Sequence, residues 1–575
     1  NVYLLKSGSS GILIETGSGK VLDYLEEVGV EKIEWVLHTH SHRDQCFGDL
    51  LMKKHGSKIA IGKQEAYALQ PAGLYAPFAP PGNSGKYGKL PVLPGRMEPF
   101  QKPGVDQELT GGMEFKWKQY KIRVINTPGH TKGSVSLLVE VDGKKICFCG
   151  DLMVSGGHVR DFYSMQWIYL QNPGIDSSIV SLQKIGEFDP GLILPSHGEL
   201  IDNPVKEINL LTMRLQRVQK CLGRGGAGRW NWSGFVQISP HVIQDCGTTS
   251  QIIISDGGEA LLFDCGKGFT PERLEEAKRK FGVKKIDVII PSHWHGDHIN
   301  GISKLAKAEE SKIWVWDGLV EHLEHPEHFI TTCWFANHIK ADRILHEEEE
   351  FRWGGYSFKV YHHPVHMEEQ MGLYAKVDEL DFYFLADGTG NRRDGKMGCA
   401  LHCYNGITLK SGLMKTAQSF YEANPYICVP AHSNCFATNS NTRNEFLKWA
   451  LETTDAITAL LTPPHQEIGY DPYWAVFYPA RIIAKPGEEV QIALRLKNHA
   501  EHSITGKIWT RSYGNLIIEQ ESLEYTLAPG EQKDFPLFVK IDKNASPGVH
   551  IVTADIEYDS FIFAEFAHGY IQIDE

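Results

Sequence analysis

The stretch PSHWHGDH, residues 291–298, places three histidines and one aspartate within six positions. It follows the run IDVII at 286–290, whose apolar and β-branched residues are typical of a buried parallel strand. Functional side chains usually lie where such a strand gives way to its loop. Imidazoles and carboxylates on a tight loop are donors that a divalent metal ion can use. The stretch therefore predicts a metal site at the end of a strand.

An earlier part of the chain carries a second copy of this pattern. The stretch LHTHSHRDQ, residues 37–45, has His40, His42 and Asp44 at the same spacing, but it ends in Gln45 where the later copy has His298. An amide oxygen is a weaker metal ligand than an imidazole, so we expect the earlier copy to hold its second metal ion loosely or not at all.

The repetition extends beyond the histidine clusters. A downstream histidine, an aspartate and a last histidine follow in each copy: His130, Asp151 and His197, then His366, Asp387 and His432. The aspartate lies 21 residues after the histidine in both copies, and the last histidine lies 46 or 45 residues farther on. The upstream intervals differ, 90 residues against 73, and the Pro/Gly-rich insert 71–95 lies in the longer one.

The local patterns around the clusters also match. Hairpin-like runs precede helix-like segments, VLDYLEEVG at 21–29 and TPERLEEAKRKFG at 270–282. We expect two equivalent domains, residues 1–222 and 235–460, joined by a Gly-rich linker at 223–234.

The last part of the chain has a different pattern. From about residue 476, short alternating segments are separated by turns such as KPGE and APGE, which predicts an antiparallel β-sandwich over 473–575. This region resembles Ig-like sandwiches appended to many bacterial hydrolases. We expect it to pack against the catalytic core or a neighbouring subunit.

The motifs HWHGDH, TPGHTKGS, CGD and LPSHG resemble the metallo-β-lactamase superfamily. The resemblance covers roughly residues 1–220 and 235–455 and implies an α/β fold class. The chain would then be two tandem αββα metallo-β-lactamase-like sandwiches followed by an all-β Ig-like sandwich. One departure is HPVHM at 363–367, where His366 is in place but the usual following Thr and Gly-Ser are absent.

The resemblance also implies a ligand set for each copy. In the second copy His293, His295 and His366 would bind one ion, Asp297, His298 and His432 a second, and Asp387 would bridge them. In the first copy the matching residues are His40, His42 and His130, then Asp44 and His197, with Asp151 bridging. The full site in the second copy would hold two ions and the degenerate site in the first one or two. Zn²⁺ suits these donors best, and Fe or Mn also fit them.

The implied activity is hydrolysis by a hydroxide bound between two metal ions. The ions lower the pKa of a shared water toward ~7, and the hydroxide attacks an ester-like bond of an ester, lactone or thioester, mainly at the second copy. Asp297, and Asp44 in the first copy, would be catalytic by both ligating and orienting the nucleophile. The alternatives are a phosphodiester or phosphonate hydrolase, and a partly degenerate scaffold whose first copy is non-catalytic.

The segment GNRRDGKMG at 390–398 follows Asp387 and offers Arg392, Arg393 and Lys396 to an anionic group of the substrate. The alternative interpretation is an ordinary charged surface turn. In the first copy, aromatic residues of the insert at 71–104 are candidates to cap the site.

Composition limits the partners. Hydrophobic residues make up 42% and charged residues 22%, which is typical of a globular protein, and a net charge of −13 disfavours nucleic acid or an anionic membrane. We expect a small-molecule substrate and allow a homo-oligomer. The 11 cysteines include no CxxC pair, which slightly favours a cytoplasmic location. An extracytoplasmic location stays open because the first fold begins without its expected leading strand, so a signal peptide before Asn1 is possible.

Overall fold

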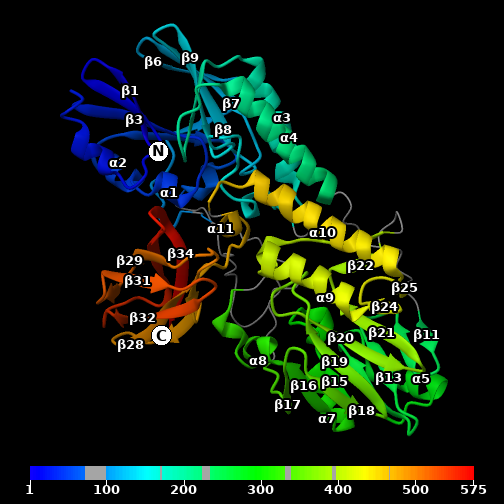
Figure 1. The fold of residues 1–575 in the computed structure, drawn as a ribbon. Coiled ribbons are helices and arrows are strands. Elements are labelled where there is room, and N and C mark those ends of the chain that lie inside the picture. The colour runs from blue at the N-terminus through cyan, green and yellow to red at the C-terminus, as the bar shows by residue number, and fades with distance from the viewer. Residues whose placement is uncertain are drawn as a thin grey trace. The chain divides into compact units, whose positions relative to one another are not determined.

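The computed structural model describes residues 1–70, 97, 99–168, 171–222, 234–330, 338–391, 396–464 and 466–574 (Figure 1). The chain divides into two compact units. The first combines the N-terminal residues up to Gln219 with the C-terminal residues from Ile457, and the second holds Lys220–Ala456. The predicted insert 71–95 and linker 223–234 fall almost entirely outside the described residues.

The N-terminal part of the first unit has two five-stranded sheets. One sheet has the order β1 (Tyr3–Ser7), β2 (Ser10–Ile14), β3 (Lys32–His38), β4 (Lys58–Gly62) and β5 (Gln107–Leu109). The other has the order β10 (Leu192–Pro195), β9 (Lys144–Gly150), β8 (Val135–Val141), β7 (Tyr120–Asn126) and β6 (Glu114–Trp117). Strands β2 to β5 are parallel, and so are β9 and β10.

The two sheets pack face to face because alternate side chains of each are apolar. One core joins Ile12 and Leu37 of the first sheet to Val124 and Leu137 of the second. A separate core on the other side of the first sheet includes Val36. Strands buried on both faces need nearly continuous apolar sequence, which is why the run before His38 contains so few polar residues.

The second unit also has two main sheets. One has the order β11 (Phe235–Ser239), β12 (Val242–Asp245), β13 (Gln251–Ile254), β14 (Glu259–Phe263), β15 (Lys285–Ile290), β16 (Lys312–Trp316) and β17 (Arg343–Leu345). The other has the order β18 (Glu350–Trp353), β19 (Tyr356–His362), β20 (Met371–Val377), β21 (Leu380–Ala386), β24 (Ile427–Pro430) and β25 (Phe436–Ala437). Strands β22 (Thr389–Asn391) and β23 (Met397–Cys399) form a small separate hairpin. One core contains Leu262 and Ile289 of the first sheet with Leu373 and Phe384 of the second.

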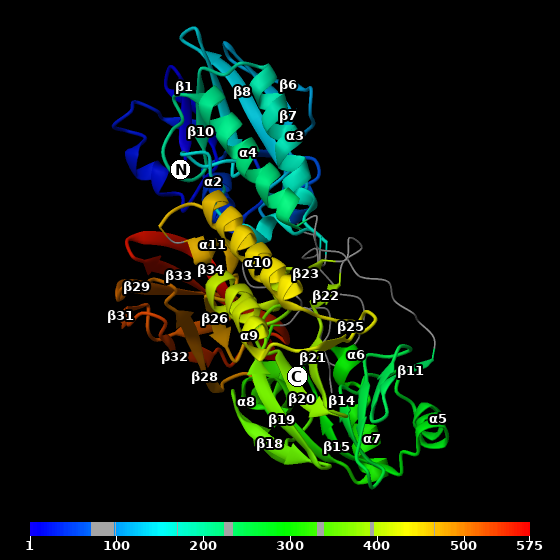
Figure 2. The same cartoon turned by 45° about the vertical axis from the view of Figure 1, so that its right-hand side comes forward.

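The helices lie between and beside these strands. They are α1 (Arg43–Cys46), α2 (Asp49–Lys54), α3 (Pro173–Glu187), α4 (Pro204–Leu222), α5 (Pro271–Phe281), α6 (Gly296–Ile299), α7 (Ile302–Glu309), α8 (Asp317–Glu324), α9 (Lys415–Ala423), α10 (Ser440–Leu460) and α11 (Gln466–Tyr470). Short helical turns are η1 (Lys20–Tyr24), η2 (Ala66–Ala68), η3 (Tyr163–Met165), η4 (Pro326–His328), η5 (Cys403–Asn405) and the π-helical η6 (Leu409–Met414). Helices α3 and α4 run side by side along the β6–β10 sheet (Figures 1 and 2). In the described part of the chain, no helix is both long enough and apolar enough to cross a membrane.

The two predicted helix-like segments have different outcomes. The later one forms α5, where Thr270 caps the first turn by accepting from Arg273 N at 3.3 Å and Gly282 ends the helix in the left-handed conformation. The earlier one forms only the 3₁₀ turn η1 and the turns that follow it, so the prediction of a helix over 21–29 is wrong. No residue of η1 is buried, and a short helix without a buried face gains too little from packing to persist.

The region from β26 onward is all-β. Its sheets have the orders β26 (Ala475–Tyr478), β28 (Glu489–Lys497), β32 (Gln532–Ile541), β30 (Leu516–Ile518), and β27 (Arg481–Ala484), β34 (Phe561–Ile573), β33 (Gly548–Tyr558), β29 (Ile504–Tyr513), β31 (Ser522–Leu527). Strand β34 lies against α1, and the buried Arg43 donates to Phe566 O at 3.3 Å. The expected packing of this region against the N-terminal α/β part is thus present.

Candidate metal centres

The second unit brings seven predicted ligands together, and we call them the central cluster. They come from loops at the ends of β15, β19, β21 and β24 and from α6: His293, His295, Asp297, His298, His366, Asp387 and His432. Strands β14 and β15 are parallel, as are β21 and β24, so the loops after these strands meet at one edge of the paired sheets.

Four members of the central cluster form a buried group suited to one ion. The donor atoms of His293, His295, His366 and Asp387 all lie within 4.8 Å of one another. His366 Nε2 is 3.1 Å from His295 Nδ1 and 3.7 Å from Asp387 Oδ2. Burial lowers the pKa of His366 to about 4, and burial with the neighbouring imidazoles holds the pKa of His293 and His295 well below the ordinary value. All three rings are therefore neutral at pH 7, which is the form that binds a metal.

The other members form an adjoining group that shares Asp387. His432 Nε2 lies 3.0 Å from Asp297 Oδ2 and 3.2 Å from Asp387 Oδ2, and His298 Nε2 lies 3.3 Å from Asp387 Oδ1. Burial would raise the pKa of Asp387, but His432 and His298 hold it well below its ordinary value. Burial opposes protonation of His432, yet Asp387 and Asp297 raise its pKa to about 10. The carboxylates are ionised, as metal ligands must be.

Asp264 and Ser292 orient two of the histidines from behind. Asp264 accepts hydrogen bonds from Ser292 N at 2.7 Å and Ser292 Oγ at 2.9 Å, and it lies 2.8 Å from His298 Nδ1. The Ser292 hydroxyl is in turn 2.8 Å from His293 Nδ1. Both histidines are thereby held with Nε2 directed at the centre, an arrangement typical of metal sites. Sequence reasoning missed Asp264, although its position at the end of an apolar strand was a usable signal.

The N-terminal part of the first unit contains the second group, which we call the N-terminal cluster: His40, His42, Asp44, His130, Asp151 and His197. The donor atoms of His40, His42, His130 and Asp151 lie within 4.8 Å of one another. His130 Nε2 is 3.0 Å from His42 Nδ1 and 3.3 Å from Asp151 Oδ2. Burial lowers the pKa of both His42 and His130, so these two residues offer neutral imidazoles.

Buried atoms test whether metal ions fit these groups. His293 Nε2 and His40 Nε2, with Asp151 Oδ1, make no hydrogen bond to any described residue although they are buried. Buried polar atoms are normally hydrogen-bonded. Atoms without hydrogen-bond partners at the centre of a donor cluster are therefore suited to bind a metal ion, which accepts their lone pairs. The donor sets therefore fit divalent metal ions.

An arginine occupies the other half of the N-terminal cluster. Arg160 Nη1 lies 2.6 Å from Asp44 Oδ2, 2.7 Å from His197 Nε2 and 3.5 Å from Asp151 Oδ2. Burial would raise the pKa of Asp44, but Arg160 and His197 hold it well below its ordinary value. Among the described residues, Asp44 joins no group of three metal donors. Sequence reasoning missed Arg160.

The polar network behind the N-terminal cluster differs from its central counterpart. Glu15, at the end of β2, accepts from Thr39 N at 3.0 Å and lies 2.7 Å from His38 Nδ1, and His38 Nε2 lies 2.9 Å from Asp49. Glu15 thus has the place that Asp264 has in the second unit, but its histidine partner comes from the strand. The absence of a histidine at position 45 leaves that carboxylate available for His38.

Each shared aspartate follows a residue with left-handed backbone. Gly150 has φ 60° and precedes Asp151, and Ala386 has φ 52° and precedes Asp387. Non-glycine residues rarely adopt this conformation, and where they do the surrounding structure imposes it. The kink turns the next side chain from the strand into the cluster.

The substrate-binding role of Arg392, Arg393 and Lys396 stays a prediction. Arg392 and Arg393 lie outside the described residues, and Lys396 is exposed. The aromatic residues of the insert, at 75, 78 and 87, also lie outside them. Trp294, between the ligands His293 and His295, is buried.

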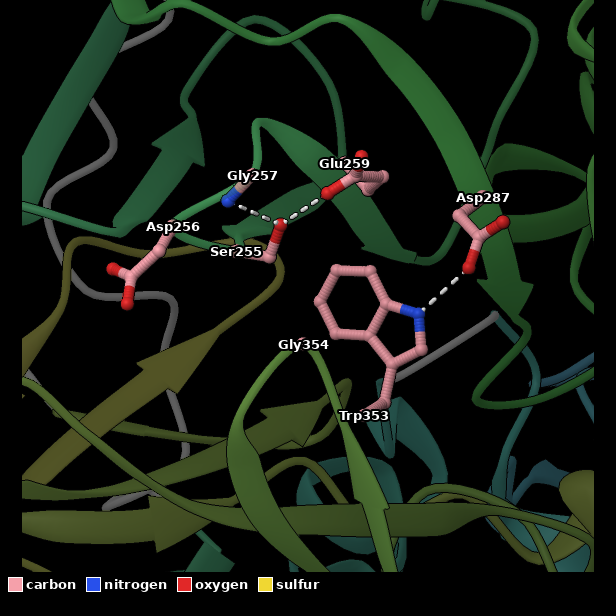
Figure 3. Close-up of a pocket in the computed structure, with 7 residues that line it drawn as sticks. All are labelled: Ser255, Asp256, Gly257, Glu259, Asp287, Trp353 and Gly354. Carbon is pink, nitrogen blue, oxygen red and sulfur yellow. Dashed lines mark hydrogen bonds between the residues drawn. The ribbon is translucent and has the colours of Figure 1, made fainter.

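Two cavities differ in their position relative to the metal centres. One of about 160 Å³ lies beside Arg160 and His197 and is bounded by Phe561–Phe563 at the start of β34. The other, of about 430 Å³, is open and lies around Trp353 (Figure 3). Two of its carboxylates are engaged locally, Asp287 by Trp353 Nε1 at 2.9 Å and Glu259 by Ser255 Oγ at 2.7 Å. Glu259 begins β14 and the central cluster follows the opposite end of β15, so this open cavity is not part of the metal centre.

A family model described as the metallo-beta-lactamase superfamily matches residues 1–197 and 245–407, more than half of the chain. Beta-lactamase-like protein 2 homolog of Drosophila melanogaster is 28% identical over 231 residues, which are 39% of this chain and 66% of the relative. Hydroxyacylglutathione hydrolase of Brucella ovis is 26% identical over 171 residues, 28% of this chain and 53% of the relative. The chain thus spans between about half and two thirds of the length of these relatives. A solved metallo-beta-lactamase from Cronobacter sakazakii is 21% identical to this chain, with a TM-score of 0.26. The match covers 33% of this chain and 72% of the solved chain.

Proposed function

The chain belongs to the metallo-beta-lactamase superfamily, and from this premise we propose that it is a metal-dependent hydrolase acting on an ester-like bond at the central cluster. The observation that carries the proposal is the pair of adjoining donor groups that share Asp387. Donor groups that share one carboxylate match the needs of a two-metal site.

Two divalent ions bound there would supply a water of lowered pKa and an electrophilic partner for the substrate oxygen. His293, His295 and His366 would hold one ion and Asp297, His298 and His432 the other, with Asp387 between them. We propose Zn²⁺ for these ions because neutral imidazoles and carboxylates suit it.

The side chains of the cluster also have roles of their own. The Asp297 side chain is 54% exposed, whereas His293 is fully buried, so Asp297 is the carboxylate that faces an incoming substrate. We propose that Asp297 orients the nucleophilic water and accepts its proton. The exposed side of His432, whose side chain is 42% exposed, marks the open edge of the centre.

The substrate class rests on the chemistry of relatives. One relative carries a name stating that it hydrolyses hydroxyacylglutathione, which favours an acyl bond in an ester, lactone or thioester. We also propose that residues 1–222 and 235–460 are two copies of one fold and that 473–575 is an Ig-like sandwich. Matched sheet pairing supports the first, since β2–β3 and β14–β15 are parallel in both parts.

Two single variants test the proposal. His295→Ala removes a donor from the central cluster, and we expect turnover of chromogenic esters, lactones or thioesters to fall about 100-fold or more. His42→Ala removes the corresponding donor from the N-terminal cluster and serves as the matched control, with most turnover retained. Metal content, measured by inductively coupled plasma mass spectrometry, is expected to fall in both variants.

Three results would overturn parts of this proposal. Full turnover by His295→Ala would exclude the central cluster as the catalytic centre. Faster turnover of a phosphodiester than of every ester-like substrate would replace the substrate class. Absence of bound metal in the wild-type chain would exclude metal-dependent hydrolysis.

A further inference from the structure

The guanidinium of Arg160 lies among the side chains that would form the second metal position of the N-terminal cluster. One nitrogen, Nη1, contacts Asp44 at 2.6 Å and His197 at 2.7 Å, and it is 3.5 Å from Asp151. Arg160 comes from the loop after β9, which is held by backbone bonds from Val154 N to His158 O and from His158 N to Val154 O. The backbone of this loop before Arg160 is therefore held by hydrogen bonds of its own.

Three members of this group match the central cluster closely. His197 Nε2 is 3.0 Å from Asp44 Oδ2 and 3.7 Å from Asp151 Oδ2. The corresponding distances for His432 are 3.0 Å to Asp297 and 3.2 Å to Asp387.

The two clusters differ at two positions. The central cluster completes its group with His298, whereas the N-terminal cluster has Gln45 and adds Arg160. The N-terminal cluster thus lacks a metal-binding histidine at the same position where it has an additional cation.

We infer that the N-terminal cluster holds a single metal ion on His40, His42 and His130 and that Arg160 takes the place of the second ion. The inference rests on the proposed function, because it assumes that these histidine trios bind divalent metal. Arg160 is then a positioning residue that supplies a permanent positive charge to Asp44.

The donor chemistry of arginine supports this assignment. An arginine has only hydrogen-bond donors and cannot ligate a metal ion, and Arg160 Nη1 lies 2.7 Å from His197 Nε2, the nitrogen that a second metal ion would need. Gln45 Nε2 also lies 2.9 Å from the same atom. A second divalent ion would have to displace a guanidinium that remains charged at any physiological pH, against repulsion at short range.

Metal stoichiometry of the full chain tests the inference. With Co²⁺ as the probe, we expect about three ions per wild-type chain, about two at the central cluster and one at the N-terminal cluster. The double variant Gln45→His, Arg160→Ala restores the missing ligand and removes the competing cation. We expect it to bind about four ions per chain, with a new exchange-coupled Co²⁺ pair visible by electron paramagnetic resonance.

Control variants separate this effect from damage to the fold. Arg214→Ala removes an arginine that donates to Gly156 O at 2.7 Å in the same loop but does not contact the cluster, and we expect about three ions. Arg160→Lys keeps the positive charge and should also stay near three. Circular dichroism of each variant shows whether it folds, and if the double variant unfolds, Gln45→His alone is expected to remain near three.

The outcomes distinguish this inference from the proposed function. Binding of four ions by the wild-type chain, or by Arg160→Lys, would overturn the role of Arg160 while leaving metal-dependent hydrolysis intact. A folded double variant that still binds about three ions would overturn it as well. No loss of an ion in His42→Ala would instead remove the premise that the N-terminal trio binds metal.

Discussion

The imidazole of His298 donates from Nδ1 to Asp264 at 2.8 Å, and this bond directs the opposite nitrogen toward Asp387. Without the carboxylate, the ring would lose its fixed orientation. We predict that Asp264→Ala lowers metal affinity at the central cluster by about 10–100-fold, measured by competition with a chromophoric chelator. Asp256→Ala is the control, since its carboxylate is 96% exposed and lies 3.5 Å from His241, away from the central cluster. Equal affinity of Asp264→Ala and the wild type would refute the orienting role.

We predict opposite changes in stability when the residues with left-handed backbone before the two shared aspartates are substituted. Ala386 adopts φ 52°, so Ala386→Gly is expected to raise the unfolding free energy by about 0.5–1 kcal/mol. Gly150→Ala adds a Cβ that would lie 2.5 Å from Thr39 Oγ1 and also strains the backbone, so we expect a loss of about 1–3 kcal/mol. Denaturant unfolding measures both. A stabilised Gly150→Ala would show that the kink has no structural need for glycine.

Stability should depend on pH through the partly buried contact between His241 and Asp378. His241 N donates to Asp378 at 2.9 Å, and its Nδ1 lies 2.6 Å from the other carboxylate oxygen. Burial would raise the pKa of Asp378, but the bonds from His241 and Ser239 lower it. The depressed pKa stabilises the fold above the unfolded value near 4, and this contribution is lost as the pH falls through the folded pKa.

The variant Asp378→Asn tests this dependence and keeps a residue type that tolerates the left-handed backbone at this position. At pH 7 we expect it to unfold with a free energy lower by about 1 kcal/mol than the wild type. The difference should shrink steadily below about pH 4. A difference that stays constant from pH 7 to pH 3 would mean that ionisation of Asp378 contributes nothing.

Matched spacing was a reliable guide to the donor clusters for a physical reason. His293, His366 and Asp387 follow strands, and parallel or paired strands of fixed length bring their ends to one edge. The residue types and the order of strands therefore suffice to predict that these side chains meet. Burial and pKa could not be predicted, because both depend on neighbours far away in the chain.

Arg160 shows what spacing cannot supply. It lies nine residues after Asp151, and no motif marks it. Its role depends on how the loop after β9 folds back toward Asp44, which is decided by backbone bonds that carry no sequence pattern. Gln45 was the signal available in the sequence. A buried carboxylate that lacks its histidine partner needs another donor or cation beside it.

The C-terminal β region supports the N-terminal cluster through Arg43. This arginine is buried beside Asp44, donates to Phe566 O at 3.3 Å, and lies 4.5 Å from the ring of Phe100. Arg43→Ala would leave that carbonyl without its donor and open a cavity, so we expect the first unit to lose about 2–4 kcal/mol of stability. Arg43→Lys keeps the charge and most of the packing and should lose less. Limited proteolysis measures the release of β34 directly. Equal protease resistance of Arg43→Ala and the wild type would show that the β region holds its place on α1 without this contact.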